Sequence, residues 1–372
     1  GGGLRRGLTV FQFGISIFLI IGTAVIGRQV HYLQNKDLGY DKDRLLAVSL
    51  PDESSARIEV LKNALRREGA AARVTGTASN MANLNWSSGS ASWPGKNPDL
   101  KVITYNNYVD EDFAETFGVS LRAGRFFSKD FPADREGYVV NESFERLLGE
   151  GSAVGKTLVY WKNPGPIIGV LKDFHFQTLQ SQIQPLVLML RPEQVNLCYL
   201  RIPEGGRPAA LERIGAVWKE VMPEYPFQYR FVDEALDSYY QTVRRTGRLA
   251  DTFAVLAVFI ACLGLLSLAS FMTERRAREI SIRKVLGASV PSILVLLTRE
   301  FTVGVLLANI LAWPAAYLIT NRWLSQFAYR APVGAGVFAL SAAAALVVAL
   351  LAVGVQTLRA ALSHPAKALR TE

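Results

Sequence analysis

Four long runs without a charged residue constrain this chain more than any other feature of its sequence. The runs are Gly7–Gly27, Thr252–Met272, Phe301–Asn321 and Ala331–Leu358. A helix of about 20 apolar residues is long enough to cross the hydrocarbon core of a bilayer. We therefore expect four transmembrane helices, and a polar domain outside the membrane between the first and the second.

The first run has an alternative interpretation as a secretory signal peptide. Arg5 and Arg6 precede it, and Gly22-Thr23-Ala24 is a weak match to a cleavage site. The apolar region of a signal peptide is usually ~7–15 residues long, and this run is longer. We therefore favour a retained membrane anchor.

The positive charge lies around the apolar runs and not on the polar domain. Residues 28–247 hold 27 Lys and Arg and 27 Asp and Glu, whereas the rest of the chain holds 14 and 5 and so accounts for the whole net charge of +9. A nucleic-acid-binding protein would instead carry a broad basic face. The distribution argues against nucleic acid and for a role of the charge in membrane orientation.

The basic residues also predict the orientation of the spans. Four spans place both termini on one side, where residues 5–6, 273–288 and 359–370 carry ten Lys and Arg. The short loop on the opposite side carries Arg322 and Arg330. Because basic residues are retained in the cytoplasm, we expect both termini inside and the polar domain outside.

Four arginines next to the polar domain count against this orientation. They are Arg28, Arg244, Arg245 and Arg248. We expect them to snorkel towards the membrane surface or to belong to the outer domain.

The polar domain combines strands and helices in mixed order, which predicts an α+β fold. Long segments between the predicted elements suggest a subdomain inserted at about residues 118–190. The predicted strands are Arg44–Leu50, Arg73–Ala78, Lys101–Val109, Gly137–Asn141, Leu158–Trp161, Pro166–Asp173, Leu186–Leu190, Cys198–Ile202 and Phe227–Val232. The predicted helices are one capped by Ser54 or Ser55 and ending near Glu68, then Glu111–Phe117, Glu142–Leu148 and Leu211–Val221.

Asp233–Thr273 contains no proline and predicts one long helix that enters the membrane. The expected organisation is then a helical membrane protein with an α+β extracytoplasmic domain. Its parts are a first span in 1–27, the outer domain in 28–247, three spans in 248–358 and a cytoplasmic tail in 359–372.

Residues 273–288 (TERRAREISIRKVLGA) form a basic, amphipathic segment between the second and third spans. The segment contains five basic residues and two acidic residues, Glu274 and Glu279. Gly287 can end a helix. Ile280, Ile282, Val285 and Leu286 supply an apolar side. Such a segment either contacts a cytoplasmic partner or only sets topology, and its spacing does not decide between the two.

The sequence predicts no active site. GSAVGKT, which begins at Gly151, is close to a phosphate-binding loop, but the first glycine of that motif falls on Glu150 and a helix precedes the stretch. His31, His175 and His364 lie far apart and have no metal-ligand spacing. We expect a non-catalytic protein that holds no cofactor and no metal.

Small residues in the second and third spans allow close contact between helices. They are Gly264, Ser267, Ser270, Gly304 and Ala308. Packing within this chain and contact between subunits remain equally open as interpretations.

The chain resembles MacB/FtsX-type ABC transporter permeases over nearly its whole length. TERRAREISIRKVLGAS resembles the cytoplasmic coupling segment of that family, and HPAKALR resembles its C-terminus. FGVSLRAGRFFSKD, VVNESF, AVGKTL and IIGVLKDFHFQTLQSQIQPLVL resemble its periplasmic core. Residues 11–43 are similar to the start of the second half of duplicated permeases, which implies that the chain is the C-terminal half of an eight-span protein.

The resemblance implies a permease that moves substrates such as peptides, lipoproteins or hydrophobic drugs outside the membrane. A cytoplasmic ABC ATPase, which binds the ATP and Mg²⁺, would drive the coupling segment. The long helix would carry this movement to the outer domain. The residues implied in contact with the ATPase are Glu274, Arg275, Glu279, Ile280, Ile282, Lys284 and Gly287.

The resemblance also implies partners and a location. The family works with two four-span halves, so a second half or another copy is expected, in the bacterial inner membrane. A periplasmic adaptor is a further candidate partner. The alternative function is that of division-type members, in which an ATPase drives a cell-wall hydrolase through the outer domain.

Overall fold

The computed structural model describes residues 2–51, 57–204, 206–275, 279, 282–283, 286 and 288–362. Its contacts divide the chain into two compact units. Unit 1 comprises residues 1–34, 241–326 and 330–372, and unit 2 comprises Asn35–Tyr240 together with Phe327–Tyr329. The chain therefore passes between the units at the ends of its long helices.

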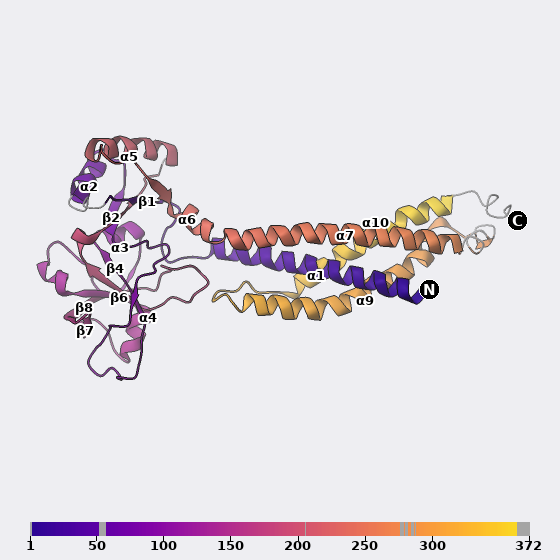
Figure 1. Ribbon diagram of the computed structural model, residues 1–372, viewed down its shortest axis with the longest axis horizontal. Helices are drawn as coiled ribbons and strands as arrows, with labels where there is room; N and C mark the ends of the chain where they lie inside the picture. The colour runs from indigo at the N-terminus through magenta and orange to yellow at the C-terminus, as the bar shows by residue number, and fades with distance from the viewer. Residues whose placement is uncertain are drawn as a thin grey trace. The chain divides into compact units, whose positions relative to one another are not determined.

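In the residues that the structure describes, unit 1 contains four long helices, labelled α1, α7, α9 and α10 in Figure 1. They are α1 (Gly2–Asn35), α7 (Gln241–Arg275), α9 (Val290–Leu324) and α10 (Ala335–Leu362). Each contains a stretch long and apolar enough to span a membrane: Gly7–Asn35, Val243–Arg275, Phe301–Leu324 and Ala335–Gly354. The four predicted transmembrane helices are thus confirmed.

Small side chains line the contacts between these helices. Ala261 of α7 and Ala308 of α9 are fully buried. A Cβ atom added to Gly264 would lie 2.7 Å from Oε1 of Gln12 in α1. Gly264 and Ala308 therefore serve packing within this chain, one of the two uses expected from the sequence.

The predicted single helix over Asp233–Thr273 is wrong. The structure has a short helix α6 (Val232–Tyr239) and then a break at Tyr240, before α7 begins at Gln241. Tyr240 has φ −93° and ψ 0°, is buried, and its hydroxyl accepts a hydrogen bond from the N–H of Leu179 at 3.2 Å. This tertiary contact holds Tyr240 in unit 2. The sequence around Tyr240 contains no proline or glycine that would predict the break.

Unit 2 is built around one mixed sheet in the order β11-β1-β10-β2-β4-β9-β6-β8-β5, with β3 on β4 and β7 on β8. Among the described strand pairs, β4–β9 and β6–β8 are parallel and the others are antiparallel. The strands are β1 Leu45–Ser49, β2 Arg73–Thr77, β3 Ser87–Ser88, β4 Thr104–Val109, β5 Leu121–Gly124, β6 Tyr138–Asn141, β7 Thr157–Tyr160, β8 Asn163–Leu171, β9 Leu186–Leu190, β10 Leu197–Arg201 and β11 Tyr229–Phe231.

The sheet is narrowest between β2 and β4, which share the single residue pair Thr77–Val109. β3 and β4 precede residue 118, and β4 pairs with β9 of the predicted insert. The compact units also do not separate residues 118–190 from the rest of unit 2. An insert with those limits therefore stays a prediction.

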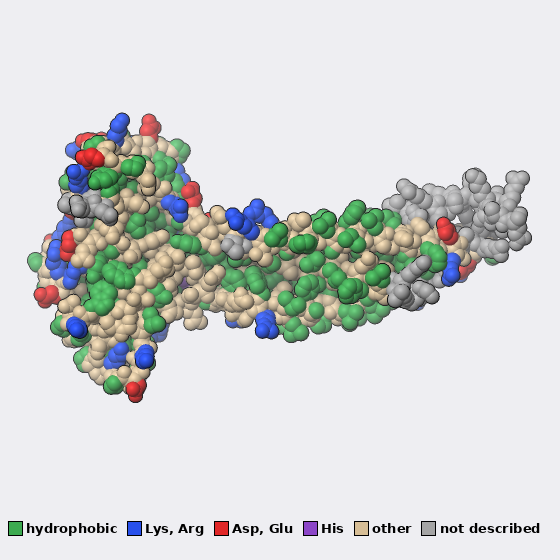
Figure 2. All heavy atoms as spheres, viewed as in Figure 1, with side chains coloured by type: hydrophobic (Ala, Val, Ile, Leu, Met, Phe, Trp, Pro, Cys, Tyr) green, Lys and Arg blue, Asp and Glu red, His purple; other side chains and the backbone are tan. Residues whose placement is uncertain are grey.

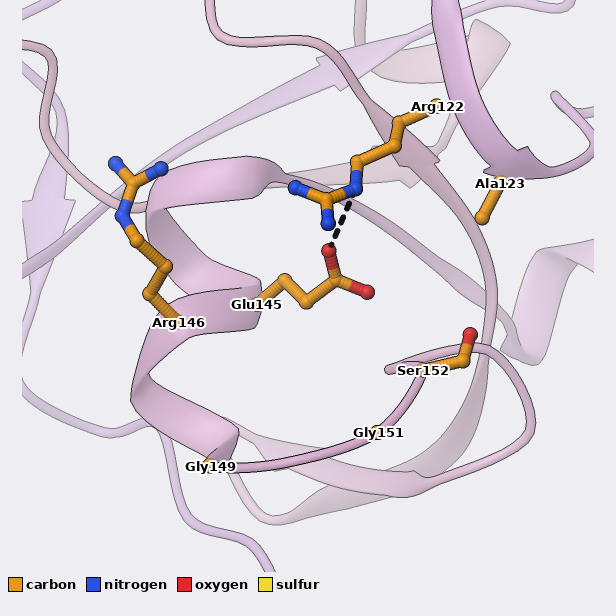
Figure 3. Close-up of a pocket in the computed structure, with 7 residues that line it drawn as sticks. All are labelled: Arg122, Ala123, Glu145, Arg146, Gly149, Gly151 and Ser152. Carbon is orange, nitrogen blue, oxygen red and sulfur yellow. Dashed lines mark ion pairs between the residues drawn. The ribbon is translucent and has the colours of Figure 1, made fainter.

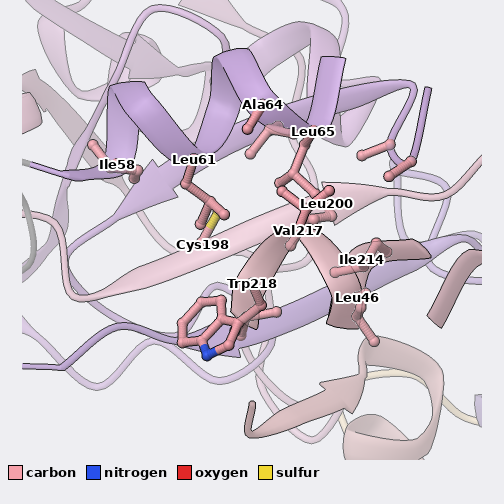
Figure 4. Close-up of a cluster of buried hydrophobic side chains, with 14 of the residues drawn as sticks. Leu46, Ile58, Leu61, Ala64, Leu65, Cys198, Leu200, Ile214, Val217 and Trp218 are labelled. Carbon is pink, nitrogen blue, oxygen red and sulfur yellow. The ribbon is translucent and has the colours of Figure 1, made fainter. Parts of the chain in front are cut away.

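Among the described residues, one hydrophobic cluster lies on each side of this narrow point. In the first, α2 (Ile58–Arg67) and α5 (Arg207–Val221) cover β1, β10 and β2 (Figure 4). Leu61 and Trp218 face Cys198 of β10 there. The second core gathers apolar side chains of β6, β7, β8 and β9 around Phe144 of α4 (Glu142–Glu145).

Most predicted elements are present, with shifted ends. The Ser54 and Ser55 predicted to cap α2 lie outside the described residues, and the helix runs from Ile58. The short helix α3 (Phe113–Phe117) ends at Gly118, whose φ of 73° is the left-handed conformation expected of a terminating glycine. β5 was not among the predicted strands.

Candidate functional site

The segment between α7 and α9 is the candidate site that the sequence singles out. Glu274 and Arg275 occupy the last positions of α7, and both are exposed. The guanidinium of Arg275 lies 4.9 Å from the ring centroid of Phe271. A cation over an aromatic face is a weak attraction at an exposed site.

The described part of the segment after α7 contains a short helical turn. The N–H of Leu286 donates to the carbonyl of Ile282 at 3.0 Å, and Ala288 donates to Arg283 at 2.9 Å. Glu279 and Arg283 form an ion pair of 2.8 Å at the i, i+4 spacing. This charged pair supports the helical conformation by a few tenths of a kcal/mol.

The same turn presents an apolar surface. Ile282 and Leu286 are four residues apart, so they lie on one face of the turn. Their exposed fractions are 57% and 80%, although aliphatic side chains of this size are usually buried. The described part of the segment therefore exposes two neighbouring aliphatic side chains beside a charged pair.

The structure thus describes four of the seven predicted contact residues, namely Glu274, Arg275, Glu279 and Ile282. Ile280, Lys284 and Gly287 lie outside the described residues. Two residues of the turn, Arg283 and Leu286, were not among the seven. Helical spacing could have found both, because each is four residues after a predicted one.

The near-match to a phosphate-binding loop has a different local structure from that motif. Gly149 ends a short 3-10 helix (Arg146–Leu148), and β7 follows the loop, so the order is helix, loop, strand. Lys156 donates to the carbonyl of Glu150 at 3.2 Å and closes the loop on itself. A phosphate-binding loop instead follows a strand and opens a helix.

A pocket of about 450 Å³ lies beside this loop (Figure 3). Its lining combines Arg122 and Ala123 of β5, Glu145 of α4, Arg146, and the loop residues Gly149, Gly151 and Ser152. Arg122 pairs with Glu145 at 3.3 Å, and Arg146 pairs with Asp173 at 2.9 Å. The guanidinium groups of Arg122 and Arg146 are thus both paired with carboxylates of unit 2. The pocket therefore offers little uncompensated charge to a ligand.

His175 is a buried side chain of unit 2. It follows β8, and its ring packs edge-on against Tyr329 at 4.9 Å. Burial, then the nearby charge of Lys36, lower its pKa to about 4. Among the residues that the structure describes, no three His, Cys, Asp or Glu side chains gather closely enough to hold a metal.

His175 also takes part in fixing the loop between α9 and α10. The N–H of Ala328 donates to the carbonyl of Gln180 at 3.0 Å, and the ammonium of Lys36 lies 4.5 Å from the ring centroid of Tyr329. Residues 327–329 therefore belong to unit 2 by their contacts, although the helices on either side belong to unit 1.

Two family models match the chain. The MacB-like periplasmic core domain matches residues 7–214, and the FtsX-like permease C-terminal matches residues 252–365. The first match covers more than half of the chain and includes most of unit 2. The second includes α9, α10 and the segment that precedes α9.

Individual proteins are similar at low identity. The macrolide export ATP-binding/permease protein MacB of Chromobacterium violaceum is 23% identical over 77% of this chain and 45% of its own length. The probable syringafactin export ATP-binding/permease protein SyfD of Pseudomonas syringae pv. tomato is 26% identical over 51% of this chain and 30% of its own. This chain spans less than half the length of these curated relatives.

Among solved structures, the periplasmic region of MacB from Actinobacillus actinomycetemcomitans is similar with a TM-score of 0.38 and 16% identity, covering 55% of this chain and 94% of that one. A domain of a putative permease protein from Porphyromonas gingivalis is similar with a TM-score of 0.37 and 20% identity, covering 51% and 90%.

Proposed function

This chain belongs to the family of MacB/FtsX-type ABC transporter permeases, and we propose that it transmits movement from a cytoplasmic ATPase to its extracytoplasmic domain. The ATPase would hold the ATP and Mg²⁺, and the permease would supply the surfaces that move. The chain would act with a second four-span half or another copy of itself in the inner membrane.

The observation that carries this proposal is the exposed apolar pair Ile282 and Leu286 beside the Glu279–Arg283 ion pair. Burial of an aliphatic side chain of this size in an interface contributes about 1.5–3 kcal/mol. The charged pair next to it would fix the orientation of the docked partner. Glu274, Arg275, Ile280, Lys284 and Gly287 would complete this contact surface.

The chain path offers a route from this surface to unit 2. α7 is continuous from Arg275 back to Gln241, so a displacement at its cytoplasmic end reaches the break at Tyr240. There the chain enters α6 and the outer sheet domain. α9 leads from the same segment to residues 327–329, which contact Gln180 and His175.

The substrate class is proposed from the relatives. The names of two similar proteins refer to export of macrolides and of syringafactin. They support export of hydrophobic or amphipathic molecules, including peptides, lipoproteins and hydrophobic drugs. A periplasmic adaptor is a further proposed partner.

The test is ATP hydrolysis by the full chain reconstituted with the ABC ATPase encoded by a neighbouring gene. The I282A/L286A variant should bind the ATPase roughly tenfold more weakly per residue and lose substrate-stimulated hydrolysis. The V60A/I103A variant is a matched control, because it truncates two similarly exposed aliphatic side chains of unit 2.

Unchanged coupling in I282A/L286A, together with unchanged coupling after replacement of Ile280 and Lys284, would contradict the proposal. The division-type function would be favoured instead by a different pair of results. The wild type would export no substrate but would control a cell-wall hydrolase, and I282A/L286A would lose this control.

A further inference from the structure

Four arginines of unit 1 have exposed side chains near the ends of the helices that continue into unit 2. They are Arg28 of α1, Arg245 and Arg248 of α7, and Arg322 of α9, and we call them the outer arginine cluster. All four lie inside the candidate membrane spans. Figure 2 shows basic side chains towards these ends of the helices, whereas hydrophobic side chains cover their middle.

Helix contacts place the four arginines at one level of the bundle. A Cβ atom on Gly247 would lie 3.1 Å from Ile26, so residues 245–248 of α7 run alongside Arg28 of α1. Gly304 of α9 similarly faces Val10 of α1, at 3.8 Å.

The position of Arg322 follows from that second contact. Arg28 and Arg322 each lie 18 residues beyond their contact point, in helices that run in the same direction. At 1.5 Å per residue both are about 27 Å further along the bundle, which brings Arg322 level with Arg28.

Within unit 1, the described residues place little negative charge beside this cluster. In the described part of the chain, none of the four guanidinium groups forms an ion pair or a side-chain hydrogen bond. Asp251 is three residues from Arg248 and exposed, but no ion pair joins them in the described residues. Arginines at the ends of membrane spans direct their guanidinium groups towards the membrane surface, where an anion or water can meet them.

Their side of the membrane makes the cluster more unusual. Basic residues are normally retained in the cytoplasm, and a surplus on the other side opposes the preferred orientation. The helix ends concerned lead into the domain that matches the periplasmic core model, so they face outwards. These arginines therefore oppose the preferred membrane orientation, and a specific contact with an anion would offset that unfavourable effect.

We propose that the outer arginine cluster binds the phosphate groups of anionic phospholipids in the outer leaflet of the inner membrane. A guanidinium group meets a phosphate through two parallel hydrogen bonds, and the apolar faces below the cluster accommodate acyl chains. Phosphate is the anion that a bilayer supplies at this depth. The inference rests on the membrane topology alone and would survive the failure of the proposed ATPase contact.

The test is native mass spectrometry of the detergent-purified full chain with phosphatidylglycerol and with phosphatidylcholine of the same acyl chains. The wild type should retain phosphatidylglycerol at least fivefold more strongly. Since each basic residue near a membrane surface contributes about fivefold, R245Q/R248Q should lose most of this preference. R213Q/R230Q, which removes the same charge from the exposed surface of unit 2, should keep it.

R245K/R248K retains both charges and should keep most of the preference, which separates lost charge from lost folding. Equal retention of the two lipids by the wild type, or an unchanged preference in R245Q/R248Q, would overturn the proposal. Displacement of the lipid by an equal concentration of glycerol 1-phosphate would also overturn it, because the site would then recognise soluble phosphate and not a lipid.

Discussion

The ammonium group of Lys62 lies 2.7 Å from a carboxylate oxygen of Asp110, and both side chains are buried. Asp112 lies 2.9 Å from the same ammonium, and the N–H of Gly76 donates to Asp110. The group therefore joins α2 and β2 to the chain after β4. It reinforces the sheet where β2 and β4 share only the pair Thr77–Val109.

Replacing Lys62 by Met should destabilise unit 2 by about 3–5 kcal/mol, because it leaves the buried Asp110 carboxylate without its partner. Burial alone would lower the pKa of Lys62, but the charges of Asp110 and Asp112 outweigh it and raise that pKa, so the lysine is charged in the fold. Urea denaturation of the full chain in detergent, followed by tryptophan fluorescence, measures the loss.

A second measurement localises this effect. Cys198 is fully buried in the core beneath α2, and burial raises the pKa of its thiol to about 12, so maleimide should reach it only after local opening. In a C262A background, K62M should speed its alkylation. Arg66→Met removes a half-exposed partner of Asp112 and should cost under about 1 kcal/mol. Equal costs for the two variants would refute the role of the buried pair.

The low pKa of His175 predicts an acid-sensitive stability. Burial, then Lys36, hold this pKa at about 4, against the ordinary value of 6.5. In the unfolded chain the imidazole of His175 binds a proton below about pH 6.5, whereas in the folded chain it binds one only below about pH 4. Stability is therefore full above pH 6.5 and falls between 6.5 and 4, by roughly 3 kcal/mol at most.

His175→Phe retains a ring against Tyr329 and should remove this loss. Denaturation midpoints of the full chain at pH 7.5, 6.5, 5.5 and 4.5 measure it. His31→Phe, which replaces an exposed histidine on α1, is the control and should leave the slope unchanged. The same slope in H175F as in the wild type would show that other groups cause the acid sensitivity.

Much of the fold was predictable because it rests on local patterns. Long uncharged runs gave the four spans, and apolar strands such as Leu186–Leu190 were placed within a residue. The start of β8 was not predictable, because Trp161 and Lys162 form the turn before it with φ of 48° and 67°. Such turns normally carry Asn or Gly, so this one has no local signal.

The unpredicted features arise from long-range contacts. Lys62 and Asp110 are 48 residues apart, and nothing near Lys62 distinguishes it from an exposed helical lysine. For the candidate site, charge pattern and family resemblance found the segment but not its full surface. Leu286 was not among the seven predicted contact residues. Those residues were chosen by their positions in the family motif, which carry no information on the exposure of a side chain.

Tyr240 gives the last prediction, because its contact replaces the expected continuous helix by a break. Tyr240→Phe removes the acceptor of the Leu179 N–H and leaves a buried donor unpaired, at a cost of about 1–3 kcal/mol. Without this contact, residues 239–241 are free to become helical, since their sequence contains no helix breaker. Tyr239→Phe, at a half-buried neighbour, is the control.

Spin labels on exposed positions 237 and 245, on either side of the break, report the change in the full chain. A continuous helix fixes their separation at about 12 Å of rise. Y240F should shift the measured distance distribution towards that of a straight helix, whereas Y239F should not. An unchanged distribution in Y240F would mean that the break is held by the chain on its two sides and not by the hydroxyl of Tyr240.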